Sequence, residues 1–310
     1  MSGTVRTEQH GRVLLATLSN PPHGLFDDPL VVALSALVER AETDEGVGAV
    51  VLTGDHPERF LAHYDVAELL QAAEESPSLS PGVARASLRL AGALRKVPGS
   101  EQALGRTSAA GLVAIERFHE TMLRMESCGA VFIAAINGSA QGGGCELSLA
   151  CDFRWMAAGD HLIGQPEILF GFPPGGGGTQ RLARMLGTSK ALRLVLDGGP
   201  LSPDEALEIG IVDRILPAGE LVEAVMREAE RLAGRPKAGV AAAKRSIYFG
   251  GSLPLADGMR LERAEFLATL PSEDAKAAMR AYVEALERTG ELPGYDRDAM
   301  RAAVERGRFT

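Results

Sequence analysis

A strand, a helix and a second strand follow one another near the start of the chain, and this order constrains the fold more than any other feature. Residues 12–18 alternate and then become continuously apolar, which predicts a strand that ends at Asn20-Pro21-Pro22. Residues 30–42 carry apolar side chains at helical spacing, and residues 47–52 have the pattern of a short buried strand. Two strands joined through a helix normally run parallel with a right-handed crossover. The chain is therefore expected to be an α/β protein built on a mostly parallel sheet.

The rest of the chain continues this alternation and then becomes helical. Further strands are predicted over residues 130–137 and 149–157, and helices over residues 109–126, 179–186 and 190–197. Beyond residue 220 nearly everything has a helical pattern, with breaks at 234–236 and 250–254. This pattern predicts a core over residues 1–215 and a helical C-terminal region over residues 216–310.

Composition and charge exclude several classes of protein. A formal charge of -9 on 310 residues argues against the broad basic face that a nucleic-acid binder needs. No apolar run approaches the ~18 residues of a membrane span, and the first residues show no apolar signal segment. The three cysteines contain no CxxC pair, which is typical of a reduced protein. We therefore expect a cytoplasmic protein that binds neither nucleic acid nor a membrane.

Residues 71–108 differ in character from their surroundings. A turn-rich stretch over residues 74–82 is followed by Arg85, Arg89, Arg95 and Lys96. We interpret this segment as a surface insertion with a short basic helix. Its prolines and glycines also fit a mobile cover over a site, because long loops in compact proteins are often functional.

The densest chemical signal is the glycine-rich run over residues 137–147, which follows a predicted strand and includes Gly142-Gly143-Gly144. A strand-to-helix turn of this kind can direct free backbone N–H groups at an anion, and glycine lets a ligand approach the main chain closely. A purely structural turn is the alternative. The run is neither a P-loop, a dinucleotide fingerprint nor a nucleophile elbow. The six histidines have no metal-ligand spacing, so no metal site is expected.

Two glutamates stand in unusual surroundings for surface carboxylates. Glu146 follows the glycine triplet, and Glu167 lies among apolar, proline and glycine residues within the segment 164–182. Partial burial raises the pKa of a carboxyl group toward neutrality, which suits general acid–base catalysis. The alternative is that each glutamate caps a helix start.

Together, residues 137–146 and 164–182 resemble the signature of the crotonase superfamily, the enoyl-CoA hydratase/isomerase family. Further likeness lies in residues 48–54, 60–65, 196–202 and 206–213 and in the helix 261–284, so that it runs from about residue 10 to about residue 288. The resemblance implies a crotonase-like spiral of ββα units with a helical trimerisation region. It also implies a homo-oligomer, either a trimer or a dimer of trimers.

The resemblance further implies a reaction. A thioester carbonyl would lie in an oxyanion hole between the backbone N–H groups of Tyr64 and Gly143, and Glu146 and Glu167 would hold one water over the β-carbon of an enoyl-CoA. Members limited to isomerisation, decarboxylation or thioester hydrolysis commonly lack one of these glutamates, so the pair favours a hydratase. An enoyl-CoA isomerase, another acyl-CoA lyase and a non-catalytic CoA-binding homologue are the alternatives. No cofactor is implied, since coenzyme A is part of the substrate.

Contacts to the acyl-CoA are also implied, at Leu25, Ala62, Asp65, Gly142, Phe266 and Tyr282. Tyr282 matches a position that usually reaches the ligand of a neighbouring subunit. His63 and Tyr64 depart from the common Gly-Ala pair, and their bulk is expected to reshape the pocket. A lysine common in the family near the CoA phosphates is Ala285 here. Four basic residues either replace it or form a solvated helix face: Arg85, Arg89, Arg95 and Lys96. The insertion is expected to form one wall of the acyl pocket.

Overall fold

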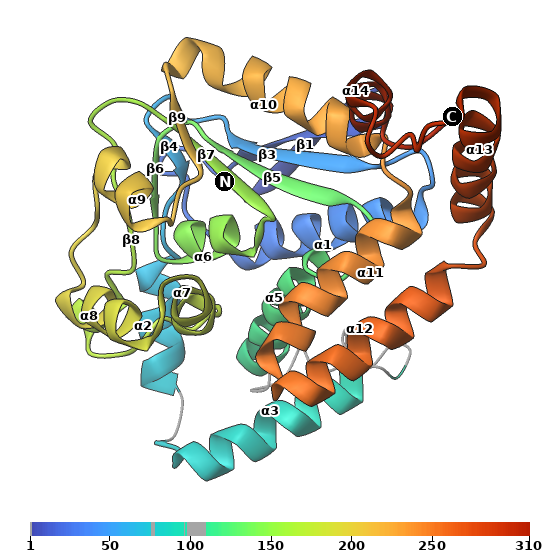
Figure 1. The fold of residues 1–310 in the computed structure, drawn as a ribbon. Helices are drawn as coiled ribbons and strands as arrows, with labels where there is room; N and C mark the ends of the chain where they lie inside the picture. The colour runs from blue at the N-terminus through green and yellow to red at the C-terminus, as the bar shows by residue number, and fades with distance from the viewer. Residues whose placement is uncertain (1, 76–77, 96, 98–109) are drawn as a thin grey trace.

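The fold is known from a computed structural model, which describes residues 2–75, 78–95, 97 and 110–310. Its larger sheet has six strands in the order β1-β2-β3-β5-β7-β9 (Figure 1). The strands are β1 (Thr4–His10), β2 (Val13–Ser19), β3 (Ala49–Gly54), β5 (Val131–Ile136), β7 (Phe153–Ala157) and β9 (Arg214–Leu216). Only the β1–β2 pair is antiparallel, and every other pair of neighbours is parallel. The predicted parallel α/β sheet is confirmed.

A smaller parallel sheet contains β4 (Arg59–Leu61), β6 (Ser139–Gln141) and β8 (Ile163–Gly164). The chain passes from a strand of the larger sheet to a strand of the smaller sheet and then into a helix, and it repeats this passage. Thus β3 and β4 lead into α2 (Val66–Glu75), and β5 and β6 lead into α6 (Gly143–Ala150). β7 and β8 lead into the short 3-10 helix η1 (Glu167–Phe170) and then α7 (Gly178–Leu186). This repeat is the spiral of ββα units that the sequence predicts.

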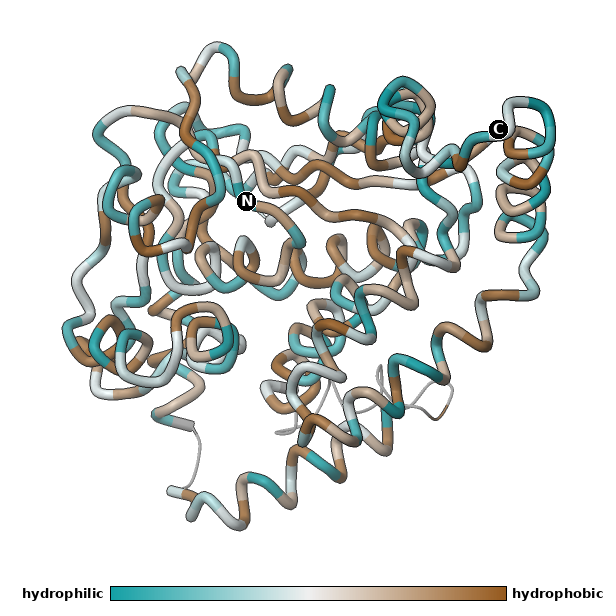
Figure 2. Tube along the Cα trace, viewed as in Figure 1, coloured by the Kyte–Doolittle hydropathy of each residue, from teal (hydrophilic) through white to brown (hydrophobic). Residues whose placement is uncertain are grey.

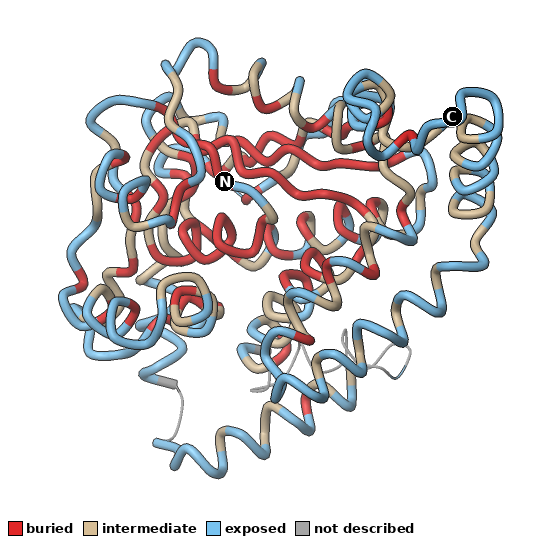
Figure 3. The backbone as a smooth tube through the Cα atoms, viewed as in Figure 1, coloured by how far each residue is buried: buried red, intermediate tan, exposed pale blue. Residues whose placement is uncertain are grey.

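Helices cover both faces of the larger sheet and enclose the core. α10 (Ala218–Ala233) packs Leu221 and Val225 against one face, whereas α1 (Asp28–Thr43) and α5 (Ala110–Met125) contribute to the cluster on the other face. Figures 2 and 3 show the apolar, buried strands between these layers. The boundary predicted at residue 215 therefore falls within β9, just before α10, a helix that completes the core.

The remaining helices extend from this layered body. They are α3 (Pro81–Arg95), α8 (Thr188–Asp197), α9 (Pro203–Ile209), α11 (Lys237–Tyr248), η2 (Gly250–Ser252), α12 (Leu255–Thr269), α13 (Glu273–Thr289) and α14 (Arg297–Arg306). The predicted helical C-terminal region and its two breaks are confirmed. Neither α12 nor α13 buries a single residue, and Figure 3 shows both largely in the colours of exposed and intermediate residues. Among the described residues, no helix combines the length and the apolar character needed to cross a membrane.

The strand predicted over residues 149–157 is wrong in its first part. Leu149 and Ala150 are the last residues of α6, and β7 begins only at Phe153. All eight residues of α6 are buried. A helix without a polar face has no periodicity that distinguishes it from a buried strand.

The described part of the insertion is largely helical. Residues 71–75 complete α2, Pro81 and Gly82 open α3, and Gly92 lies inside that helix. The predicted basic helix is confirmed over residues 81–95, and Ala91 is buried. Lys96, residues 76–77 and residues 98–108, with the turn residues Pro77, Pro98, Gly99 and Gly105, lie outside the described part of the chain.

Candidate active site

Three segments converge at the end of the smaller sheet. β4, β6 and β8 are parallel neighbours, so the residues that follow each strand emerge at the same edge. Gly144 N–H donates to the carbonyl of Ala62 at 3.1 Å, and Gly142 N–H donates to the carbonyl of Gly164 at 2.9 Å. A methyl group on Gly144 would lie 2.0 Å from the carbonyl oxygen of Leu61. Glycine is required there because the N-terminus of α6 lies directly against the end of β4.

Two backbone N–H groups near Phe26 have no protein acceptor within the described residues. Phe26 N–H donates to the carbonyl of His63, and Asp65 N–H donates to the carbonyl of Phe26. Because bonding groups alternate along an extended backbone, the intervening N–H of Tyr64 points to the opposite side. Gly143 begins α6, where a backbone N–H has no intrahelical partner, and a methyl group on it would lie 3.3 Å from the Phe26 ring. Two free donors of this kind can bind one developing oxyanion.

The two side chains next to these donors, His63 and Tyr64, are each held by a hydrogen bond. The hydroxyl of Tyr64 donates to Asp28 Oδ1 at 2.9 Å, so its ring is anchored to the first turn of α1. The His63 ring has Nδ1 2.8 Å from the carbonyl oxygen of Tyr64. Since a carbonyl only accepts, this contact places the proton on Nδ1.

Glu146 is almost fully buried, with 3% of its surface exposed. Its Oε1 accepts hydrogen bonds from the N–H groups of Gly176 at 2.6 Å and Gly178 at 2.9 Å. Burial raises the pKa of Glu146 to about 7, and the charge of Glu167 acts in the same direction. The two N–H donors and Arg181 oppose this shift. The carboxyl group therefore titrates near neutral pH, as an acid–base catalyst requires.

Glu167 opens η1 and is half-buried. With the amide nitrogen of Gln165 facing it, that nitrogen donates to both carboxylate oxygens of Glu167, at 3.0 and 3.1 Å. Burial raises the pKa of Glu167, and the nearby His63 lowers it. A methyl group on Gly178 would lie 2.7 Å from the Gln165 amide and 3.1 Å from Glu146 Oε1. Gln165 therefore lies close to both glutamates.

The loop that binds Glu146 is held from α5 and α7. His119 Nε2 lies 2.6 Å from the carbonyl oxygen of Gly175. Arg181 donates to the carbonyl of Gly176 at 3.1 Å and forms an ion pair with the nearly buried Glu126 at 2.6 Å. Phe118 packs edge-on against Phe26, with ring centroids 5.0 Å apart. A methyl group on Gly176 would lie only 2.2 Å from the Phe118 ring.

Sequence reasoning did not assign roles to four of these residues. Gln165 and Arg181 lie inside the segment 164–182, whose spacing marked it as functional. Phe118 and His119 belong to α5 and carry no local signal, because only tertiary packing brings them to the glycine-rich loop.

The structure places the other predicted residues in two groups. Ala62 N–H donates to the carbonyl of Gly24 at 2.7 Å, so the loop that carries Leu25 lies beside Ala62. The Asp65 carboxylate accepts from Ala67 N–H at 2.8 Å and thus caps α2. These residues join Tyr64, Gly142, Gly143 and the two glutamates at one location.

Phe266 and Tyr282 lie apart from that location in the single chain. Phe266 is 59% exposed on α12. Tyr282 on α13 packs edge-on against Phe309 and accepts from Gly294 N–H. Figure 1 shows α13 at the opposite side of the molecule from α7. In the described part of the chain, no three His, Cys, Asp or Glu side chains are arranged to hold a metal ion.

Known proteins share sequence and fold with this chain. Residues 101–289 match the family model described as enoyl-CoA hydratase/isomerase. The chain is 34% identical over 284 residues to a probable mitochondrial enoyl-CoA hydratase of Dictyostelium discoideum, covering 91% of this chain and 88% of that protein. It is 29% identical to the short-chain-enoyl-CoA hydratase of Clostridium acetobutylicum, covering 89% and 93% respectively. A solved enoyl-CoA hydratase structure from Geobacillus kaustophilus superposes with a TM-score of 0.73 and 27% identity, covering 92% and 95%.

Proposed function

This chain belongs to the enoyl-CoA hydratase/isomerase family, and on that premise we propose that it adds water across the 2,3 double bond of a trans-2-enoyl-CoA. The product is a 3-hydroxyacyl-CoA. Relatives named as enoyl-CoA hydratases, including short-chain and crotonyl-CoA hydratases, support this assignment. The protein is therefore a hydro-lyase that acts on acyl-CoA thioesters.

The proposed mechanism uses the two glutamates on one water molecule. The water oxygen bonds to the β-carbon while one ionised glutamate accepts a proton from that water. The electrons of the double bond shift toward the thioester, and the negative charge on its oxygen is stabilised by Tyr64 N–H and Gly143 N–H. The α-carbon then takes a proton supplied by the second glutamate in its protonated form. The proton gained by the first glutamate balances the one that the second has lost.

One observation carries this proposal. The carboxylate of Glu167 lies close enough to Glu146 to raise its pKa, and Glu146 is buried whereas Glu167 is half-buried. Of the two unpaired N–H donors, that of Gly143 lies in the glycine-rich turn, and that of Tyr64 lies in the segment that this turn contacts. A water molecule held by both carboxyl groups would therefore meet an acyl group whose carbonyl is bound at those donors.

The assembly and the location are also part of the proposal. We propose a homotrimer or a dimer of trimers, in which Phe266 and Tyr282 approach the acyl-CoA of a neighbouring chain. The proposed chemistry needs no cofactor, because the chain supplies the acid, the base and the oxyanion donors. The three buried free cysteines favour a reducing compartment such as the cytoplasm.

A spectrophotometric assay tests the reaction. Purified protein is mixed with trans-2-enoyl-CoAs of increasing length, and loss of absorbance from the conjugated double bond is followed. We expect saturable hydration, with the 3-hydroxyacyl-CoA identified by mass. Folded protein that hydrates none of them, or that only moves the double bond of a 3-enoyl-CoA, would contradict the proposal and favour an isomerase.

A further inference from the structure

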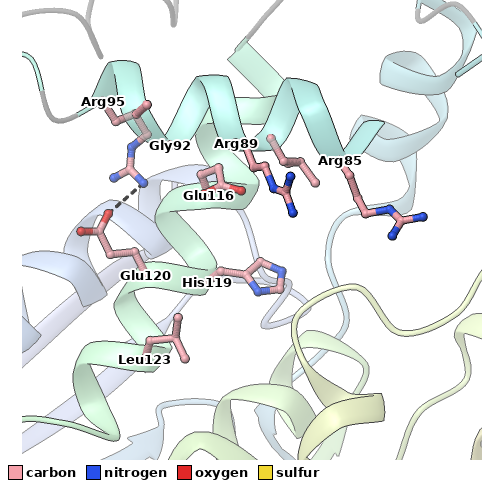
Figure 4. A pocket seen from close by; sticks show the side chains of 10 residues that line it. Arg85, Arg89, Gly92, Arg95, Glu116, His119, Glu120 and Leu123 are labelled. Atoms are coloured by element: carbon pink, nitrogen blue, oxygen red, sulfur yellow. Dashed lines mark ion pairs between the residues drawn. The ribbon is translucent and has the colours of Figure 1, made fainter. Parts of the chain in front are cut away.

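A groove of about 610 Å³ lies between α3 and α5. Its α3 wall includes Arg85, Leu88 and Arg89, and its α5 wall includes Glu116, His119 and Leu123. Figure 4 shows Arg89 and His119 projecting into the gap between the two helices, with Arg85 farther along the same side of α3. The groove therefore combines apolar side chains with three guanidinium groups, those of Arg85, Arg89 and Arg95, and with the carboxylates of Glu116 and Glu120.

The groove opens directly beside the candidate active site. His119, which lines it, contacts the carbonyl of Gly175 at 2.6 Å, and the next residue, Gly176, donates to Glu146. Phe118, adjacent to His119, packs on Phe26 next to the two unpaired N–H donors. These contacts place the groove beside the loop that binds Glu146. The far end of a long acyl group held at the proposed thioester site would extend toward the groove.

The positive charge of the α3 wall is only partly compensated by nearby carboxylates. α3 contains three arginines and no acidic residue, although the whole chain has a net charge of -9. Arg95 is paired with Glu120 at 3.0 Å. Arg85 donates through Nε to the carbonyl of Pro81, and within the described residues neither Arg85 nor Arg89 has a carboxylate at ion-pair distance. Like charges one helical turn apart disfavour a helix, so an anion bound here would be stabilising.

The same spacing elsewhere in the chain is neutralised. On α10, Arg227 and Arg231 are also four residues apart, and they form ion pairs with Glu223 and Glu228 respectively. The pair on α3 thus differs from the pair on α10 in lacking protein counter-ions. This contrast makes α10 a matched internal control.

We infer that this groove binds the far end of an acyl group that terminates in a carboxylate. Leu88 and Leu123 would contact its methylene groups, and the guanidinium groups of Arg85 and Arg89 would pair with the carboxylate, a geometry that suits two-point hydrogen bonding. Glu116 lies against Gly92, so it would repel an anion from the Gly92 end of the groove. The carboxylate of the ligand would therefore lie near Arg85 and Arg89. The inference rests on the proposed function for the position of the thioester. It names the substrate class as enoyl-CoAs of dicarboxylic acids.

Binding of saturated thioesters tests the groove without requiring turnover. Calorimetry compares adipoyl-CoA with hexanoyl-CoA and suberoyl-CoA with octanoyl-CoA. We expect the wild-type protein to bind at least one carboxylated member about tenfold more tightly than its neutral match, since charge-assisted hydrogen bonds are the strong ones. The double variant Arg85→Gln/Arg89→Gln should lose this preference. Arg227→Gln/Arg231→Gln, which removes the same charge from α10, should keep it.

Further measurements distinguish binding of the CoA phosphates from binding of a carboxylate at the end of the acyl group. Arginines that bind CoA phosphates would cause equal losses of affinity for free CoA, hexanoyl-CoA and adipoyl-CoA in the double variant, and that result would overturn the inference. Equal binding of neutral and carboxylated thioesters by the wild-type protein at both lengths would also overturn it. Arg85→Lys/Arg89→Lys, which retains the charge, should preserve part of the preference. A carboxylate preference in binding without hydration of any enoyl-CoA would support the groove and contradict the proposed function alone.

Discussion

Two N–H donors compensate only part of the cost of burying the Glu146 carboxylate. Its pKa rises from 4.5 to about 7, so the folded protein holds a proton that the unfolded chain releases between those pH values. Stability is therefore lost as pH rises from about 4.5 through 7. Glu146→Gln should stabilise the fold above pH 7 by up to about 3 kcal/mol, with the gain fading toward pH 4. Urea unfolding at several pH values measures this difference.

A glutamate with the opposite shift provides the control for that experiment. Arg231 lowers the pKa of Glu228, so Glu228→Gln should destabilise the fold at neutral pH, where the wild-type carboxylate is ionised. A gain from Glu146→Gln that does not vary with pH would show that burial of its charge is not the cause.

The same glutamates give a prediction for catalysis. Glu146→Gln and Glu167→Gln should each lower kcat by ~10²- to 10⁴-fold, the usual contribution of a general acid or base. Because both side chains act on one water, the double variant should lose less than the product of the single losses. Steady-state hydration of crotonyl-CoA measures all three, with the exposed Glu205→Gln as control. Wild-type turnover by either single variant would refute the two-glutamate mechanism.

For single residues, the sequence predicts a role at the site where a charged residue stands among apolar residues and glycines. Glu146 and Glu167 stand beside glycines and apolar residues, and both are withdrawn from solvent in the structure. Phe118 lies on an ordinary amphipathic helix, and only its packing on Phe26 brings it to the site. Contacts made across elements leave no such local trace in a single sequence.

Among the contacts between secondary-structure elements, the packing of α6 against the end of β4 determines where the site residues lie. Gly144 has no space for a side chain, because its added methyl group would lie 2.0 Å from the backbone carbonyl of Leu61. Gly144→Ala should therefore destabilise the fold by about 2–4 kcal/mol and lower hydration, since backbone cannot move aside as a flexible side chain can. Chemical denaturation and the hydratase assay measure both effects.

Gly219→Ala is the matched control, because this residue of α10 has nothing within 4 Å of an added methyl group. Alanine is the better helix former, so this variant should gain up to about 1 kcal/mol. Similar unfolding midpoints for the two variants would show that α6 tolerates displacement from β4.

Helices and strands could be predicted where the spacing of apolar residues along the sequence was distinctive. The helix over residues 109–126 and the strand over residues 130–137 have distinct patterns and were located correctly. The sequence predicts a strand at the end of α6, because a fully buried helix and a buried strand are both continuously apolar. Pro81 and Gly82 suggested a loop, yet proline is well accommodated in the first turn of a helix, where α3 places it.

At the scale of the whole molecule, two long helices have little packing within the described part of the chain: α12 is joined to α11 by the Arg245–Glu265 ion pair, and α13 contacts Phe309 through Tyr282. α12 and α13 contain 15 and 17 residues and bury none of them. Leu255, Met259 and Leu267 on α12 are 80%, 52% and 65% exposed. Helices in proteins draw most of their stability from packing an apolar face, and exposed apolar patches mark interaction surfaces. A second copy of the chain is the partner that the proposed trimer provides.

Light scattering after size-exclusion chromatography tests this assembly. We expect a mass of three or six times the 32.7 kDa chain. Leu267→Glu should shift the mass toward the monomer, because a charge would be buried without a partner in the interface. Hydration should fall together with assembly, since Tyr282 would reach the acyl-CoA only in the oligomer. Leu207→Glu on α9, at a site that is 41% exposed, should leave both unchanged. A wild-type monomer with full activity would contradict the assembly and would leave Tyr282 without a role at the site.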